Sequence, residues 1–76
     1  MDEEIFSQQV QVERKLFSFI LKQNPRGRFL RITEDVGGRR DTIIIPSPGL
    51  GDIHKVLEQA IKADQEAGPV PSVLPD

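Results

Sequence analysis

Residues 22–34 of the 76-residue chain read KQNPRGRFLRITE, and this stretch carries the clearest structural pattern in the sequence. It begins with a tight turn over residues 24–27, because Asn, Pro and Gly are the residues that turns select at their first, second and fourth positions. Residues 28–34 then alternate: leucine and isoleucine share one side, and Phe29 and Arg31 share the other. Such alternation is typical of a half-buried strand. The stretch therefore predicts a hairpin with an aromatic ring and a cation on its outer side.

Three segments outside this stretch also read as strands. Two of them alternate polar and apolar residues, and the last is a β-branched run that ends at prolines. Gln8 interrupts the apolar side of the first segment and predicts a bulge or twist there. The pair Gly37-Gly38 predicts a second tight hairpin, because both glycines tolerate positive φ. The predicted strands are residues 5–12, 15–22, 28–34 and 42–46.

The C-terminal part of the chain predicts one helix and a tail. Apolar residues recur at three- and four-residue spacing over residues 50–66, as on one side of an amphipathic helix. Asp52 is a candidate N-cap, and Gly68 and Pro69 end the pattern. Residues 67–76 contain three prolines and no periodicity, so we predict a disordered tail.

Hairpins followed by one helix predict the α+β class, as a four-stranded antiparallel sheet in the order ββββα. One side of this sheet gathers Phe17, Phe19 and Leu21, which we predict to be core beneath the helix. The predicted domain covers residues 1–66. Because residues 42–45 are apolar on both sides, we expect another chain to cover the outer one.

Length and composition limit what the chain can be. A domain of this size buries only about 60% of its unfolded surface and is marginally stable alone. With no cysteine and a single histidine, His54, we expect neither disulfides nor a metal site, and oligomerisation would extend the core. No apolar run is long enough to span a membrane, and the acidic N-terminus lacks the features of a signal peptide. We therefore expect an intracellular protein, cytoplasmic or, in a bacterium, nucleoid-associated.

Charge is distributed unevenly along the sequence. Residues 14–40 carry a balance of +6 and the remainder carries −8, which together give the net −2. A basic centre can attract a polyanion whatever the net charge. The alternative is a solvated strand face that happens to be rich in arginine.

The sequence lacks the residue groups that enzymes use. It has no glycine-rich phosphate loop and no cysteine nucleophile, and its carboxylates are scattered. His54 falls on the polar side of the predicted helix, and the serines have no candidate base. We therefore predict no catalytic residue, no metal, no cofactor and no small-molecule substrate.

A nucleic-acid interface accounts better for the basic centre. Single strands are held by cations that follow the phosphates and by aromatic rings on which bases stack. Phe29 is the candidate ring, and the amide of Asn24 can contact a base edge. A contact between two copies of the chain is the alternative role for Phe29. The candidate binding residues are Lys22, Asn24, Arg26, Arg28, Phe29, Arg31, Arg39 and Arg40.

Three stretches together resemble a single PUR repeat, the unit of the Pur-alpha-like proteins that bind purine-rich elements. They are QVQVERKLFSF, KQNPRGRFLRITE, and the strand DTIIIPSPG with the helix after it, and the likeness runs from about Glu4 to Ala63. The combination K-x-N-x-R-G-R-F-L-x-I-x-E makes the resemblance specific. Ser18 and Ile20 depart from it, since relatives often have an aromatic and an acid there.

The resemblance implies both a fold and a function. PUR repeats are ββββα units that intertwine in pairs, helices crossing, into a PUR domain similar to the Whirly fold. A chain with one repeat resembles the bacterial single-repeat type, which pairs as a homodimer. The family binds purine-rich, notably G-rich, single-stranded DNA and RNA through the sheet surface and the turn. The resemblance implies contacts by Lys22, Asn24 and Arg26, followed by Arg28, Phe29 and Arg31. DNA and RNA both remain open as ligands.

A second hypothesis belongs to a different class. The chain would be a structural homodimerisation module whose basic strip contacts an acidic protein partner. Its own acidic ends would contact or mask the basic strip of another copy. Titration with G-rich and pyrimidine-rich single strands separates the two hypotheses, because a structural module binds neither.

Overall fold

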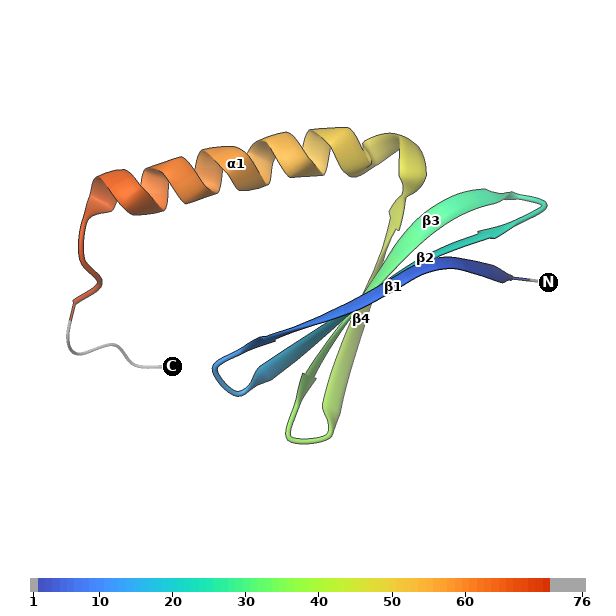
Figure 1. Cartoon of the computed structure of the whole chain (residues 1–76), viewed down its shortest axis with the longest axis horizontal. Coiled ribbons are helices and arrows are strands. Elements are labelled where there is room, and N and C mark those ends of the chain that lie inside the picture. The colour runs from blue at the N-terminus through green and yellow to red at the C-terminus, as the bar shows by residue number, and fades with distance from the viewer. Residues whose placement is uncertain (1, 72–76) are drawn as a thin grey trace.

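A computed structural model describes residues 2–71 and shows four strands followed by a helix. The strands form one twisted antiparallel sheet in sequence order (Figure 1). The elements are β1 (Glu3–Val12), β2 (Lys15–Asn24), β3 (Gly27–Val36), β4 (Arg39–Pro46), the 3-10 turn η1 (Ser47–Gly49) and α1 (Leu50–Ala67). The predicted ββββα, α+β fold is confirmed.

Each strand extends further than its predicted segment at one end or both. Strand β1 begins at Glu3, and β2 and β3 continue up to the turn that joins them, where Asn24 pairs with Gly27. An apolar pattern reveals only the part of a strand that has apolar neighbours, whereas ladder hydrogen bonds continue into polar sequence. The lengths of the strands at their polar ends, which include Asn24, Arg39 and Arg40, were therefore underestimated.

The helix begins at Leu50, as expected, and ends at Ala67, one residue beyond the expected end, but its N-cap differs from the candidate. Its N-cap is Gly49, and Asp52 lies inside the first turn, where its charge still interacts favourably with the helix dipole. At the other end, Gly68 adopts a φ of 82° and its N–H donates to the Gln65 carbonyl at 3.3 Å. Residues 72–76 of the predicted tail lie outside the residues that the structure describes.

The predicted hairpin between β3 and β4 is confirmed. Gly37 and Gly38 have φ values of 59° and 91°, as a tight hairpin of this kind requires. The Gly38 N–H donates to Asp35 Oδ1 at 3.0 Å and fixes the turn from the side of β3.

The hairpin between β1 and β2 contains a residue that the sequence did not single out. Glu13 has a φ of 54°, the left-handed conformation that favours glycine or asparagine. The Gln11 side chain donates to the Glu13 carbonyl at 2.9 Å and supports this conformation. Glu13 is thus held in a backbone conformation that costs a non-glycine residue about 1–2 kcal/mol.

Replacing Glu13 with asparagine should therefore stabilise the protein by up to about 1 kcal/mol, because asparagine tolerates this conformation better. The urea midpoint at fixed chain concentration measures the gain. Glu13→Ala is the matched control, since it also removes the carboxylate but keeps the strain. Equal midpoints for the two variants would show that the backbone conformation contributes nothing.

The bulge in β1 lies elsewhere than predicted. The register shifts between Glu4 and Phe6, whereas Gln8 pairs directly with Phe19. Gln8 is tolerated because β1 is an edge strand, and its Oε1 accepts a hydrogen bond from the Gln9 N–H at 3.1 Å. The bulge changes which residues share a face, and it brings Glu4 opposite Lys22.

Alternation gives the sheet two different sides. Residues directly opposite each other on neighbouring strands point to the same side, so the register assigns each residue to a face. We call one side the apolar face, which includes Phe6, Val10, Phe17, Phe19, Leu21, Leu30, Ile32, Ile43 and Ile45. The other is the polar face, which includes Gln9, Ser18, Ile20, Lys22, Asn24, Phe29, Arg31, Thr33, Arg40, Thr42 and Ile44.

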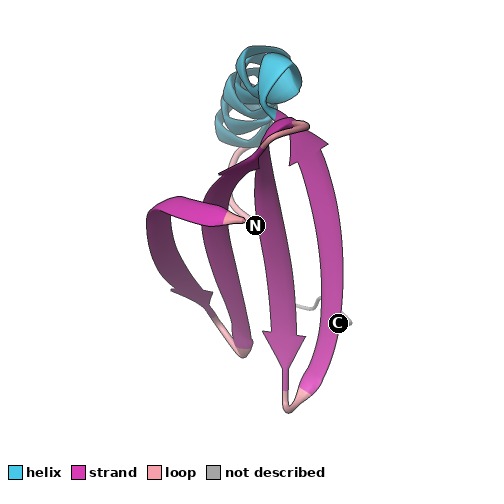
Figure 2. Ribbon diagram, turned by 90° about the vertical axis from the view of Figure 1, so that its right-hand side faces the viewer, coloured by secondary structure: helices cyan, strands magenta, loops and turns pink. Residues whose placement is uncertain are grey.

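No described residue is buried, so residues 2–71 of a single chain form no hydrophobic core. The expectation that the helix packs on the sheet above Phe17, Phe19 and Leu21 is wrong for one chain. Figures 1 and 2 show α1 beyond one end of the sheet rather than across a face. Ile43 and Leu57 consequently remain 58% and 56% exposed. A single layer of strands has no interior until a second layer covers it.

The described part of α1 is amphipathic. Ile53, Leu57 and Ile61 follow one another at four-residue spacing and share one side of the helix. Each of these three side chains is more than two-fifths exposed. Within residues 2–71, the structure has no helix both long and apolar enough to cross a membrane.

Candidate nucleic-acid interface

The polar face brings an aromatic ring and two cations together. Phe29 is half-buried, and its neighbours across the sheet are Lys22 on β2 and Pro46 on β4. Arg31 lies two residues further along β3 on the same face, between Ile20 and Ile44. This arrangement can stack a base on the ring and place phosphates at the flanking cations.

The cations near the ring are not neutralised by any residue that the structure describes. Among residues 2–71, neither Lys22 nor the side chain of Arg26 or Arg31 has a carboxylate partner. The Nε of Arg31 is enclosed and has no hydrogen-bond partner among these residues. A buried donor left without an acceptor costs free energy.

Asn24 has a structural role in the turn. Its Oδ1 accepts the Arg26 N–H at 2.9 Å, and its Nδ2 donates to Asp2 Oδ1 at 2.9 Å. The first bond is the local contact by which asparagine favours turns. One amide hydrogen and one oxygen lone pair of the side chain remain for a ligand. Asn24 therefore orients the basic turn and keeps limited capacity for a direct contact.

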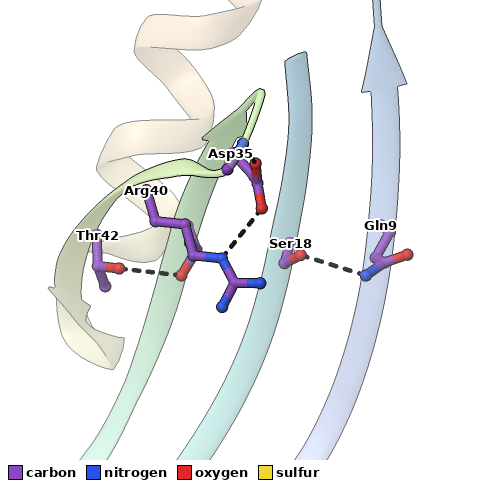
Figure 3. Close-up of polar contacts among 7 residues, drawn as sticks. Gln9, Ser18, Asp35, Arg40 and Thr42 are labelled. Atoms are coloured by element: carbon purple, nitrogen blue, oxygen red, sulfur yellow. Dashed lines mark hydrogen bonds and ion pairs between the residues drawn. The ribbon is translucent and has the colours of Figure 1, made fainter. Parts of the chain in front are cut away.

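Arg40 stands at the other end of the polar face and is held in place. Its Nε donates to Asp35 Oδ2 at 3.0 Å (Figure 3). The Gly38 N–H, followed by the Arg40 guanidinium, lowers the pKa of Asp35 from its ordinary value. Because this carboxylate stays charged, it fixes Arg40 and neutralises part of its charge.

Uncharged polar groups cross the middle of the polar face. The Gln9 amide donates to Ser18 Oγ at 3.4 Å, and the hydroxyls of Thr33 and Thr42 lie 3.1 Å apart (Figure 3). Gln9, Ser18 and Thr33 border a shallow hollow of about 300 Å³. Its lining residues are Gln9, Leu16, Ser18, Ile20, Arg31, Thr33, Asp35 and Arg40.

Two of the eight candidate residues fall on the apolar face instead. Arg28 directly precedes Phe29, so alternation sends the two side chains to opposite sides. The Arg28 guanidinium donates to Gln23 Oε1 at 2.9 and 3.2 Å, and the Gln23 amide donates to Glu3 at 2.9 Å. Arg39 lies opposite Val36, also on that side. Lys22, Asn24, Phe29, Arg31 and Arg40 share the polar face, and Arg26 lies in the turn.

Sequence reasoning missed the neutral polar residues of this face. Gln9 and Ser18 already fell on the outer side of their predicted strands, and that was the available signal. Their pairing with each other depends on register, which alternation within one strand does not give. Lys15 was also omitted; its Nζ lies 3.1 Å from Glu34 Oε2 on the apolar face.

The sequence of this chain matches a known protein family over almost all of the described residues. A family model described as "PurA ssDNA and RNA-binding protein" matches residues 2–70, which include all four strands and the helix. The chain belongs to the PurA family. The resemblance to a PUR repeat is thereby confirmed, and it covers almost all of the described residues.

Two curated relatives of this PurA chain come from a plant and a nematode. "Transcription factor Pur-alpha 1" of Arabidopsis thaliana is 55% identical over 49 residues, which are 64% of this chain and 17% of the relative. "Transcriptional activator plp-1" of Caenorhabditis elegans is 45% identical over 58 residues, 72% of this chain and 26% of the relative. The chain thus spans about a quarter or less of the length of the relatives it matches.

Proposed function

We propose that the chain binds single-stranded DNA or RNA, preferring purine-rich and notably G-rich strands, through the polar face and the turn at residues 24–27. The observation that carries the proposal is the half-buried Phe29 beside two cations, Lys22 and Arg31, that have no carboxylate partner in residues 2–71. The description of the matched family supports it. The names of the two relatives support a role in transcription.

The structure divides the candidate cations into two groups. Lys22, Arg26, Arg31 and Arg40 lie on the polar face or in the turn, where a strand stacked on Phe29 can reach them. Arg28 and Arg39 point to the other side and would act on a ligand only through the long-range field. The proposed phosphate contacts are therefore four in each chain.

Salt dependence tests this count. Each phosphate neutralised in a single strand contributes about −0.7 to the log–log slope of affinity against salt, so four contacts predict about −3 and six about −4. Arg31→Gln should make the slope less steep by about 0.7. The matched control Arg39→Gln should change the slope much less, because Arg39 would act only through the long-range field. A wild-type slope near zero would refute electrostatic binding to the polar face.

We further propose that the binding form is a homodimer. One chain exposes both an apolar sheet face and an apolar helix side. A second copy would provide a complementary apolar surface for each of them. In such a dimer, the helix of one chain would cover the apolar face of the other. The polar face and Phe29 would remain free for nucleic acid, because they lie on the opposite side of the sheet.

A second candidate is an acidic protein partner at the same turn. It is supported by the Asp2 carboxylate, which already accepts a hydrogen bond from Asn24 within the chain. A homodimer with this role would bind neither G-rich nor pyrimidine-rich single strands at low salt. Binding to either strand would exclude it as the main function.

A further inference from the structure

On the polar face, Phe29 lies in the same cross-strand row as the carboxylate residue Glu4. Glu4 lies directly opposite Lys22, and Lys22 lies directly opposite Phe29, so all three side chains point to the same side. The bulge between Glu4 and Phe6 produces this alignment. Glu4 is exposed, and its carboxylate has no hydrogen-bond or ion-pair partner in residues 2–71.

The carboxylates of Asp2 and Glu3, next to Glu4 in the sequence, do have hydrogen-bond partners. Asp2 accepts a hydrogen bond from Asn24, and Glu3 accepts one from Gln23 on the opposite side of the sheet, both at 2.9 Å. Glu4 is therefore the acid on the polar face near the ring that still has its full capacity to accept hydrogen bonds.

A carboxylate beside a phosphate-binding surface has two effects. It repels the phosphates of every strand, because like charges raise the free energy of the complex. It can also accept hydrogen bonds but cannot donate them, so it binds only a ligand edge that presents donors. A base that offers two adjacent donors would overcome the repulsion, whereas other bases would not.

Guanine is the base with that edge. Its N1–H and N2–H lie side by side and match the two carboxylate oxygens, giving a charge-assisted pair of hydrogen bonds. Adenine and cytosine place a ring nitrogen acceptor beside their amino group, and that acceptor faces the carboxylate. Thymine and uracil place their single N–H between two carbonyl oxygens.

The geometry of the row allows this contact. Glu4 and Phe29 are two strands apart, about 10 Å between backbones at the usual strand spacing. In the proposed contact, a guanine stacked on Phe29 would extend its hydrogen-bonding edge over Lys22 towards Glu4 on the far strand. We propose that Glu4 selects guanine for the base position stacked on Phe29, an inference that rests on the proposed function.

The test compares short single strands with isolated guanines, the same strands with inosine in place of guanine, and a pyrimidine strand. Inosine lacks the N2 amino group, so it loses one of the two donors. Wild-type protein should bind the guanine strand about tenfold more tightly than the inosine strand, as expected for one hydrogen bond to a charged group. Glu4→Gln should reduce this ratio to about threefold or less, and should bind the pyrimidine strand at least as well as wild type.

The matched control is Glu3→Gln, which removes the same charge from the adjacent residue on the opposite side of the sheet. It should leave the guanine-to-inosine ratio at its wild-type value. A ratio that is the same in wild type and Glu4→Gln would overturn the proposal, and so would equal tightening of all strands by Glu4→Gln. Wild-type protein that binds none of the three strands at low salt would instead overturn the proposed function on which the inference rests.

Discussion

Replacing Leu57 with aspartate is expected to abolish dimerisation and, with it, the folded state. Leu57 lies on the apolar side of α1 and is 56% exposed in the single chain, so the proposed dimer would bury it against the apolar face of the partner. The change removes about 1.5–3 kcal/mol of burial from each chain. It also places a charge in an apolar contact, which costs several kcal/mol more. The total approaches the full stability of a small domain.

Sedimentation and far-UV circular dichroism at the same chain concentration measure the effect. Gln59→Asp is the matched control, because it introduces the same residue on the opposite side of the same helix. It should leave both the dimer and the helix signal intact. A Leu57→Asp protein that sediments and melts like wild type would show that this side of α1 is not an interface.

Replacing Phe29 with alanine is expected to weaken single-strand binding by roughly tenfold to a hundredfold without unfolding the protein. Stacking of one base on an aromatic ring contributes about 1–3 kcal/mol, and each 1.4 kcal/mol is a factor of ten in affinity. The ring is on the polar face, away from the proposed dimer contact, so the truncation should cost little stability. Fluorescence anisotropy with a labelled G-rich strand measures the loss.

The control for Phe29 is Ile44→Ala. Ile44 also lies on the polar face, opposite Arg31, and is 52% exposed, but it has no aromatic ring. Its truncation should change affinity much less than that of Phe29. If Phe29→Ala unfolds or dissociates the protein, the ring belongs to a core or a contact between chains, which was the alternative role inferred from the sequence.

Much of the sheet could be predicted because its pattern is local. Alternation identified Phe29 and Arg31 as neighbours on one side of a strand, and Gly37-Gly38 identified a hairpin. Arg28 was named as a candidate because its charge adjoins the turn, and the ladder places its side chain on the other side of β3 from Phe29. Charge read along the chain does not show which face of the sheet each cation occupies.

Other features depend on information that a local pattern does not contain. The spacing of Ile53, Leu57 and Ile61 shows that one side of the helix is apolar. It does not show which surface packs against that side. The position of the bulge near Glu4 depends on the ladder to the neighbouring strand, and therefore on pairing rather than on composition. The relation of Glu4 to Phe29 follows from that pairing and could not be predicted from the sequence.

Hydrogen-bonded polar pairs close the apolar face at both ends. At one end, Arg28 and Glu3 are joined through Gln23, and at the other Lys15 is paired with Glu34 at 3.1 Å. An apolar helix laid on this face could not slide along the strands without covering one of these pairs and taking its charges out of water. The polar pairs at the two ends of the apolar face would therefore restrict two chains to a single alignment.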